Sequence, residues 1–256
     1  MLAFSCRWLA VAALAGLTLL GAPALADERI KFTSAGRGDP IQGYLTKPKG
    51  AGPFPAVVLL HTCLGLPANR RSIADALAAW GYVALFVDDF ATRGLKETCS
   101  VDFTDAMADA YGALAYLSRL PFVDRARIGA VGFSQGADTA LKIAGSPVGG
   151  SDPGFKAAAA FYPPCANEAG ASLKIPTLIL VGAGDDVTPA ADCEQLAAAQ
   201  GSMARLVVYP GARHGFDLPE FGAGRQVLGM TLAYDRAAAE KSRAELRAFL
   251  ARRLAP

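Results

Sequence analysis

One stretch, residues 127–144 (RIGAVGFSQGADTALKIA), constrains the fold more than any other. An apolar run at 128–131 leads directly into Gly132-Phe133-Ser134-Gln135-Gly136, and a helix of small residues is expected to follow at once. Between a strand and a helix, the G-x-S-x-G pattern predicts a nucleophile elbow, which exposes the serine hydroxyl at the carboxyl edge of a sheet. Both glycines are needed because a Cβ would collide with neighbouring backbone in so tight a turn. Ser134 is therefore the candidate nucleophile; without the flanking elements the motif would predict only an ordinary loop.

The first 26 residues are predicted to be an export signal and not part of the fold. Arg7 supplies a positive start, residues 9–20 are uncharged, and Ala24-Leu25-Ala26 provides the small residues that a signal peptidase needs. The apolar run is short for a membrane span, although a retained anchor is the alternative. We therefore expect residues 27–256 to form one domain that is periplasmic or secreted, without stable membrane insertion.

The composition fits a globular enzyme better than a nucleic-acid-binding protein. The chain is 52% hydrophobic and 19% charged, with a net charge of +2, and its basic residues are scattered. Because polyanion-binding proteins carry clustered basic residues, no nucleic-acid partner is expected. No internal repeat or low-complexity linker divides the chain.

Short apolar runs alternate with helical stretches, which predicts a mostly parallel sheet covered by helices on both faces. About eight strands are expected: 30–33, 41–46, 56–60, 82–87, 128–131, 157–162, 177–181 and 205–209. Besides the helix after the elbow, helices are expected at about 69–80, 103–120, 190–200 and 234–254.

Four cysteines remain if Cys6 is removed with the signal, and an even number in an exported protein favours disulfides. They allow three pairings. We expect Cys63–Cys99 and Cys165–Cys193, because the members of each pair lie just past strands on the same edge of the sheet. Free, buried thiols are the alternative.

A serine needs a general base at neutral pH, and the chain has only two histidines, His61 and His214. His214 lies beyond the last predicted strand, where the order serine, acid, histidine places the base. The acid should follow the strand at 177–181, where Asp185 and Asp186 are adjacent. Asp185 is the preferred candidate, and Asp186 is the alternative, with helix capping as its other possible role.

The loop 61–65 (HTCLG) follows the strand at 56–60, where one oxyanion donor is expected. The backbone N–H groups of Cys63 and Gln135 are the candidate donors, and His61 is expected to anchor the loop. The histidines lack H-x-x-x-H spacing and the cysteines are better explained by disulfides, so we expect no metal and no other cofactor.

Taken together, these motifs resemble the dienelactone hydrolase family of the α/β-hydrolase fold over the whole of residues 27–256. The matching segments are HTCLG, GYVALFVDDFATRG, GFSQG, FYPPC, GAGDDVTP and HGF. The resemblance implies a triad of Ser134, Asp185 and His214. It also implies hydrolysis of a small or medium ester or lactone through an acyl-enzyme.

The sequence departs from the family's namesake enzymes at several positions. They carry a cysteine nucleophile where this chain has Ser134, and a glutamate where it has Thr62. Of their two substrate-binding arginines, Arg93 matches the first, while Asp217 and Leu218 stand near the expected position of the second. These departures favour a general serine esterase over dienelactone chemistry.

Arg93 therefore has two interpretations. The resemblance implies that it binds a substrate carboxylate. Its alternative is a structural role, either as a solvated loop arginine or as a partner of Asp88 or Asp89.

Two other functions remain open. A small acyl-peptidase or thioesterase would use the same residues, although such peptidases usually carry an additional domain for which this chain has no room. A non-catalytic binding protein could also keep the fold. The pocket walls are expected in 64–71, 89–102 and 217–230.

Overall fold

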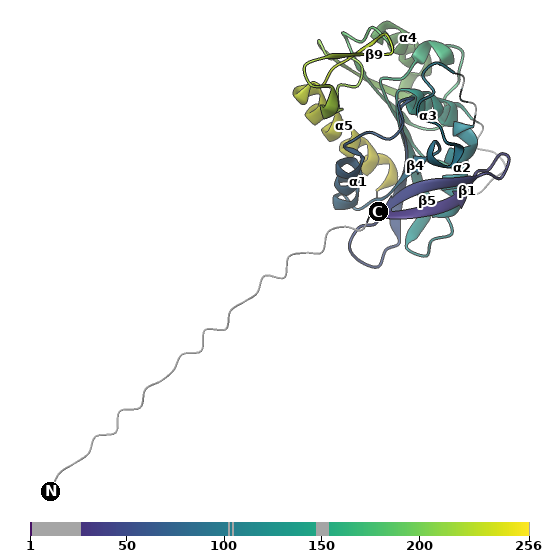
Figure 1. The fold of residues 1–256 in the computed structure, drawn as a ribbon, viewed down its shortest axis with the longest axis vertical. Coiled ribbons are helices and arrows are strands. Elements are labelled where there is room, and N and C mark those ends of the chain that lie inside the picture. Colours follow the sequence, from purple (N-terminus) through teal and green to yellow (C-terminus); the bar gives the residue numbers. More distant parts are fainter. Residues whose placement is uncertain (2–26, 102, 104, 147–153, 256) are drawn as a thin grey trace.

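The computed structural model describes Met1 and residues 27–101, 103, 105–146 and 154–255 (Figure 1). The predicted export signal therefore lies, apart from Met1, outside the described residues. One sheet of eight strands, in the order β1-β2-β4-β3-β5-β6-β7-β8, runs through the molecule.

Six strands of this sheet are parallel: β3 (Phe54–Leu60), β4 (Val83–Asp88), β5 (Val123–Phe133), β6 (Ala158–Phe161), β7 (Thr177–Gly182) and β8 (Ala204–Tyr209). Strands β4, β6 and β7 are buried at every position, as expected of strands covered on both faces. The hairpin of β1 (Asp27–Thr33) and β2 (Pro40–Thr46) adds two antiparallel strands beside β4. The sheet confirms the predicted α/β-hydrolase fold.

Helices cover both faces of the sheet (Figure 1). One apolar cluster packs α1 (Arg70–Ala79) and α5 (Arg236–Leu254) against one face. Two others pack α2 (Ala106–Leu117), α3 (Gln135–Gly145) and α4 (Ala190–Gln200) against the opposite face. Short 3₁₀ helices lie in the connections, at Ala91–Arg93, Cys165–Glu168, Gly201–Met203 and Pro219–Phe221.

All the predicted strands and helices are present, with bounds that differ by a few residues. The clearest shift is β5, which begins at Val123 instead of 128, and α2 begins at Ala106 instead of 103. A small hairpin of β9 (Arg225–Val227) and β10 (Met230–Leu232) was not predicted. Its strands are too short to show alternation. None of the described helices is long and apolar enough to cross a membrane.

Candidate active site

Ser134 occupies the sharp turn between β5 and α3. Its φ of 53° and ψ of −113° are unusual for a residue with a side chain, and its N–H donates to the carbonyl of Phe161 at 3.0 Å. A Cβ on Gly132 would collide with the Gly136 backbone, and one on Gly136 would meet the Leu60 carbonyl. The local sequence therefore forms the tight elbow that the motif predicted.

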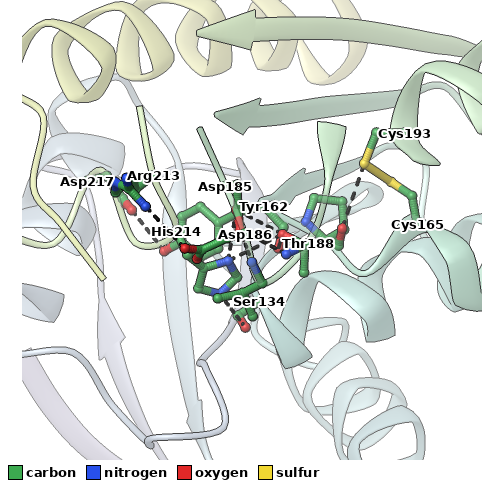
Figure 2. Close-up of polar contacts among 12 residues, drawn as sticks. Ser134, Tyr162, Cys165, Asp185, Asp186, Thr188, Cys193, Arg213, His214 and Asp217 are labelled. Atoms are coloured by element: carbon green, nitrogen blue, oxygen red, sulfur yellow. Dashed lines mark hydrogen bonds and ion pairs between the residues drawn. A yellow bond between two sulfur atoms is a disulfide. The ribbon is translucent and has the colours of Figure 1, made fainter. Parts of the chain in front are cut away.

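Three side chains from the carboxyl ends of β5, β7 and β8 meet in a continuous hydrogen-bonded chain (Figure 2). His214 Nε2 lies 2.9 Å from Ser134 Oγ, and His214 Nδ1 lies 2.9 Å from Asp185 Oδ2. His214 and Asp185 are both buried. In this arrangement an imidazole can accept the serine proton while the carboxylate fixes its tautomer.

Asp185 is held as an acceptor by more than the imidazole. Its Oδ1 accepts from the N–H groups of Val187 (2.9 Å) and Thr188 (2.8 Å), and its Oδ2 accepts from the Thr188 hydroxyl (2.9 Å). Burial alone would raise the pKa of Asp185, but the contacts with His214 and Thr188 outweigh it and lower that pKa. A carboxylate that stays ionised is suited to stabilising an imidazolium.

Asp186 points elsewhere (Figure 2). Its carboxylate accepts from Arg213 Nη1 at 3.1 Å, and its side chain is 52% exposed. Of the two adjacent carboxylates, the structure places only Asp185 against His214.

Tyr162, which the sequence did not single out, forms one wall beside the histidine. Its ring is fully buried and meets the His214 ring edge to face, with centroids 4.7 Å apart. Its φ is positive, at 44°, and its hydroxyl donates to Asp217 Oδ1 at 2.8 Å (Figure 2). Burial raises the pKa of Asp217 to about 6, although the Tyr162 hydrogen bond opposes this. No sequence pattern could have indicated this contact, because it depends on the backbone at the end of β6.

The loop after β3 carries Cys63, the first expected oxyanion donor, while Gln135 begins α3 directly after Ser134. Cys63 and Ser134 line the same cleft. Within the described part of the chain, neither the Cys63 N–H nor the Gln135 N–H donates a hydrogen bond to another residue. Neither N–H group is therefore engaged within the described part of the protein.

Both expected disulfides are present. Cys63 is bonded to Cys99, and Cys165 to Cys193. Thr98, next to Cys99, donates its N–H to the Cys63 carbonyl at 2.8 Å and its hydroxyl to Gln135 Oε1 at 2.7 Å. One segment thus holds both residues whose N–H groups are the candidate oxyanion donors.

The cleft at Ser134 is small and mainly apolar. Its volume is about 270 Å³, part of it open to solvent, and its apolar lining includes Leu64, Leu218, Phe221, Met230 and Leu232. A larger cleft of about 420 Å³ lies between α1 and α5 and reaches neither Ser134 nor His214. The expected wall segments 64–71 and 217–230 therefore do contribute to the cleft at the serine.

Arg93, for which the resemblance implies binding of a substrate carboxylate, is engaged inside the protein in this structure. Its guanidinium forms two hydrogen bonds with the fully buried carboxylate of Asp109, at 2.7 and 3.1 Å, and a third with the carbonyl of Asp89 at 2.9 Å. Arg93 does not line the cleft at Ser134. The guanidinium is thus occupied by an internal partner, and neither Asp88 nor the Asp89 carboxylate is that partner.

Among the described residues, no group of three or more histidine, cysteine or acidic side chains could hold a metal ion.

Comparison with known families and structures agrees with this geometry. A model of the dienelactone hydrolase family matches residues 41–254. The chain belongs to that family. Membership makes this protein a hydrolase of carboxylic esters or lactones, in agreement with the prediction.

Two relatives are both named as carboxymethylenebutenolidases. A candidate carboxymethylenebutenolidase of Methylorubrum extorquens is 27% identical over 69% of this chain and 68% of its own length. A second, from a Synechocystis species, is 26% identical over 69% of this chain and 81% of its own length.

Solved structures confirm the fold. A candidate dienelactone hydrolase of Klebsiella pneumoniae superposes with a TM-score of 0.69 at 22% identity, covering 88% of this chain and 98% of the other. A dienelactone hydrolase-like promiscuous phosphotriesterase from metagenomic libraries gives the same TM-score at 23% identity and the same coverage.

Proposed function

We propose that this family member hydrolyses small carboxylic esters or lactones with Ser134 as nucleophile, His214 as general base and Asp185 as the orienting acid. The observation that supports this most strongly is the continuous chain from Asp185 through His214 to Ser134, two contacts of 2.9 Å at a strained elbow. No cofactor is required for this chemistry.

In the first step Ser134 Oγ attacks the ester carbonyl and its proton passes to His214 Nε2. The carbonyl oxygen becomes an oxyanion, which the N–H groups of Cys63 and Gln135 would stabilise. His214 then returns the proton to the leaving alcohol as the C–O bond breaks. Water, deprotonated by the same imidazole, hydrolyses the acyl-enzyme and releases the acid.

The cleft supports a preference for short acyl groups. The cleft is small, because its empty space of about 270 Å³ already includes a part that is open to solvent. Its apolar walls favour a hydrocarbon acyl chain. The lining provides no arginine for a substrate carboxylate.

The test is a comparison of wild type with Ser134→Ala. A fluorophosphonate probe should label the wild-type protein at Ser134, and the variant should lose both the labelling and at least about 10³-fold of its kcat for p-nitrophenyl acetate. Turnover that survives in a folded Ser134→Ala protein would refute the assignment of the nucleophile.

We also propose that the protein is exported. The predicted signal at residues 1–26 and the two disulfides support an oxidising compartment. Cell fractionation with N-terminal sequencing would test this: a mature chain that begins near Asp27 outside the cytoplasm is expected. Full-length protein in the cytoplasm, with four free thiols, would contradict it.

A further inference from the structure

The second histidine, His61, is the buried first residue of the loop 61–65 and makes no contact with the chain of Asp185, His214 and Ser134. Its Nδ1 is 2.7 Å from the carbonyl oxygen of Thr62, and its Nε2 is 2.7 Å from Asp89 Oδ1. The Phe90 ring packs edge to face against the imidazole, with centroids 4.4 Å apart. His61 is therefore held on both sides by oxygen atoms, and with Asp89 it lines a small cavity of its own.

The Thr62 carbonyl oxygen can only accept, so Nδ1 carries the proton of its contact. Nε2 and Asp89 Oδ1 lie 2.7 Å apart outside hydrogen-bond angles, so this contact is an ion pair only when the imidazole is charged. Burial alone would lower the pKa of His61, but Asp89, with a smaller contribution from Asp88, outweighs it and raises that pKa. Nδ1 is thus the atom that donates to the Thr62 carbonyl.

The Thr62 carbonyl belongs to the same peptide group as the Cys63 N–H. In a trans peptide the C=O and the N–H point in opposite directions, so fixing one direction fixes the other. The carbonyl accepts from His61 Nδ1 and from the Gly65 N–H at 2.9 Å. While both donors are present, the Cys63 N–H must point away from them.

We propose that His61 is a positioning residue that keeps the Thr62–Cys63 peptide oriented so that the Cys63 N–H faces the oxyanion. This inference rests on the proposed function, in which Cys63 supplies one of the two donors. If Nδ1 lost its proton, its lone pair would face the Thr62 carbonyl and favour rotation of the peptide. A rotated peptide would present a carbonyl oxygen to the oxyanion instead of an N–H.

Two variants separate donation to Thr62 from contact with Asp89. In His61→Asn the amide nitrogen can occupy the place of Nδ1 and still donate to the Thr62 carbonyl. In His61→Gln it can reach the place of Nε2, toward Asp89, and the Thr62 carbonyl keeps only the Gly65 donor. Both variants place a neutral amide in the same buried site, so they are matched for burial.

We expect His61→Gln to lower kcat for p-nitrophenyl acetate by at least about tenfold, less than the 10²- to 10³-fold loss typical when an oxyanion donor is removed entirely. KM should change by less than about twofold, and affinity for a trifluoromethyl ketone, which mimics the tetrahedral intermediate, should fall with kcat. His61→Asn should keep kcat well above that of His61→Gln. Equal kcat in the two variants at similar melting temperatures would overturn the proposal.

The wild-type protein offers a test that does not depend on folding of a variant. The chain has only two histidines, so ¹⁵N spectra of histidine-labelled protein contain two imidazoles, and a His214→Asn variant assigns them. Nδ1 of His61 should carry a proton at pH 7. An unprotonated Nδ1 would refute the inference, whereas absence of probe labelling in wild type would refute the proposed function instead.

Discussion

At the scale of single residues, two adjacent carboxylates have different environments. Asp185 is buried and accepts from His214, Val187 and Thr188, whereas Asp186 lies at the surface with Arg213. Because the backbone turns between them, one residue faces the imidazole and its neighbour faces solvent. Of the two, only Asp185 can therefore act as the acid of the proposed triad.

The two carboxylates can be compared by the same substitution. Asp185→Asn should lower kcat by about 10³- to 10⁴-fold, because an amide would no longer stabilise the imidazolium and could favour the wrong tautomer. Asp186→Asn should stay within about twofold of wild type, because its exposed ion pair contributes little. Steady-state kinetics on p-nitrophenyl acetate tests this prediction. A larger loss of kcat in Asp186→Asn than in Asp185→Asn would make Asp186 the triad acid.

Asp217 makes the stability of the fold depend on pH. Its folded-state pKa of about 6 is above the ordinary value of 3.8, so the folded protein binds this proton more tightly than the unfolded chain does. The stabilisation from that proton is complete below about pH 4 and is lost as the pH rises through about 6.

Asp217→Asn should remove this pH dependence. Relative to wild type, the variant should gain about 1 to 2 kcal/mol in free energy of unfolding between about pH 4 and pH 7.5, less than the roughly 3 kcal/mol of the full shift, because Asp217 is only partly buried. Urea unfolding of both proteins across this range measures the difference. A constant difference would show that Asp217 titrates normally.

At the scale of elements, the β9–β10 hairpin joins the cleft to the histidine. Met230 and Leu232 line the cleft, Leu232 pairs with His214 in an isolated β-bridge, and the Ala233 N–H donates to the His214 carbonyl at 3.1 Å. The same hairpin therefore limits the space for the acyl group and holds the loop that carries the base.

Met230→Ala should enlarge the cleft and shift selectivity toward longer acyl chains. Each methylene that becomes buried is worth about 0.8 kcal/mol, so kcat/KM for p-nitrophenyl octanoate relative to acetate should rise about tenfold or more. Leu228→Ala is the matched control, because Leu228 lies at the turn of the same hairpin and is 59% exposed. Equal shifts in both variants would exclude Met230 as the limiting wall.

The two disulfides hold different parts of the molecule. Cys63–Cys99 links the oxyanion loop to the Thr98 segment, which also contacts Gln135, whereas Cys165–Cys193 joins the 3₁₀ helix after β6 to α4. The sequence separations are similar, 36 and 28 residues. They should therefore stabilise to a similar degree but affect catalysis differently.

Replacing each pair by serines separates these roles. Both double variants should lose about 2 to 4 kcal/mol of stability. Only Cys63→Ser with Cys99→Ser should also lower kcat, by about tenfold, because the Cys63 backbone is less restrained. Unfolding curves and kinetics at a temperature where both remain folded provide the comparison. Equal kcat values would mean that the disulfide does not position the loop.

At the scale of the whole molecule, the parts predictable from sequence are those with strong local signals. Continuous apolar runs identified the buried strands, and Gly-x-Ser-x-Gly between a strand and a helix identified the elbow. The chain has only two histidines, so there were only two candidates for the general base. Neighbouring parallel strands bring their carboxyl ends together, so Ser134, Asp185 and His214 could be expected to meet.

The remaining features depend on contacts that leave no local signal. The partner of Arg93 is Asp109, a carboxylate in the middle of α2 whose burial depends on how that helix packs. The contact of Tyr162 with His214 requires a positive φ at a residue that rarely adopts one. The β9–β10 hairpin has strands of three residues, which are too short for periodicity.

The spacing of the three triad side chains along the chain also matters during synthesis. Ser134 and its elbow are formed by β5 and α3, but the acid follows β7 and the base follows β8. A chain that has emerged from the ribosome only as far as α3 contains the serine and has nothing to activate it. With the proposed triad, the protein should stay inert toward esters until nearly all of it has been translated, and hydrolysis during synthesis would report completion of the C-terminal part of the sheet.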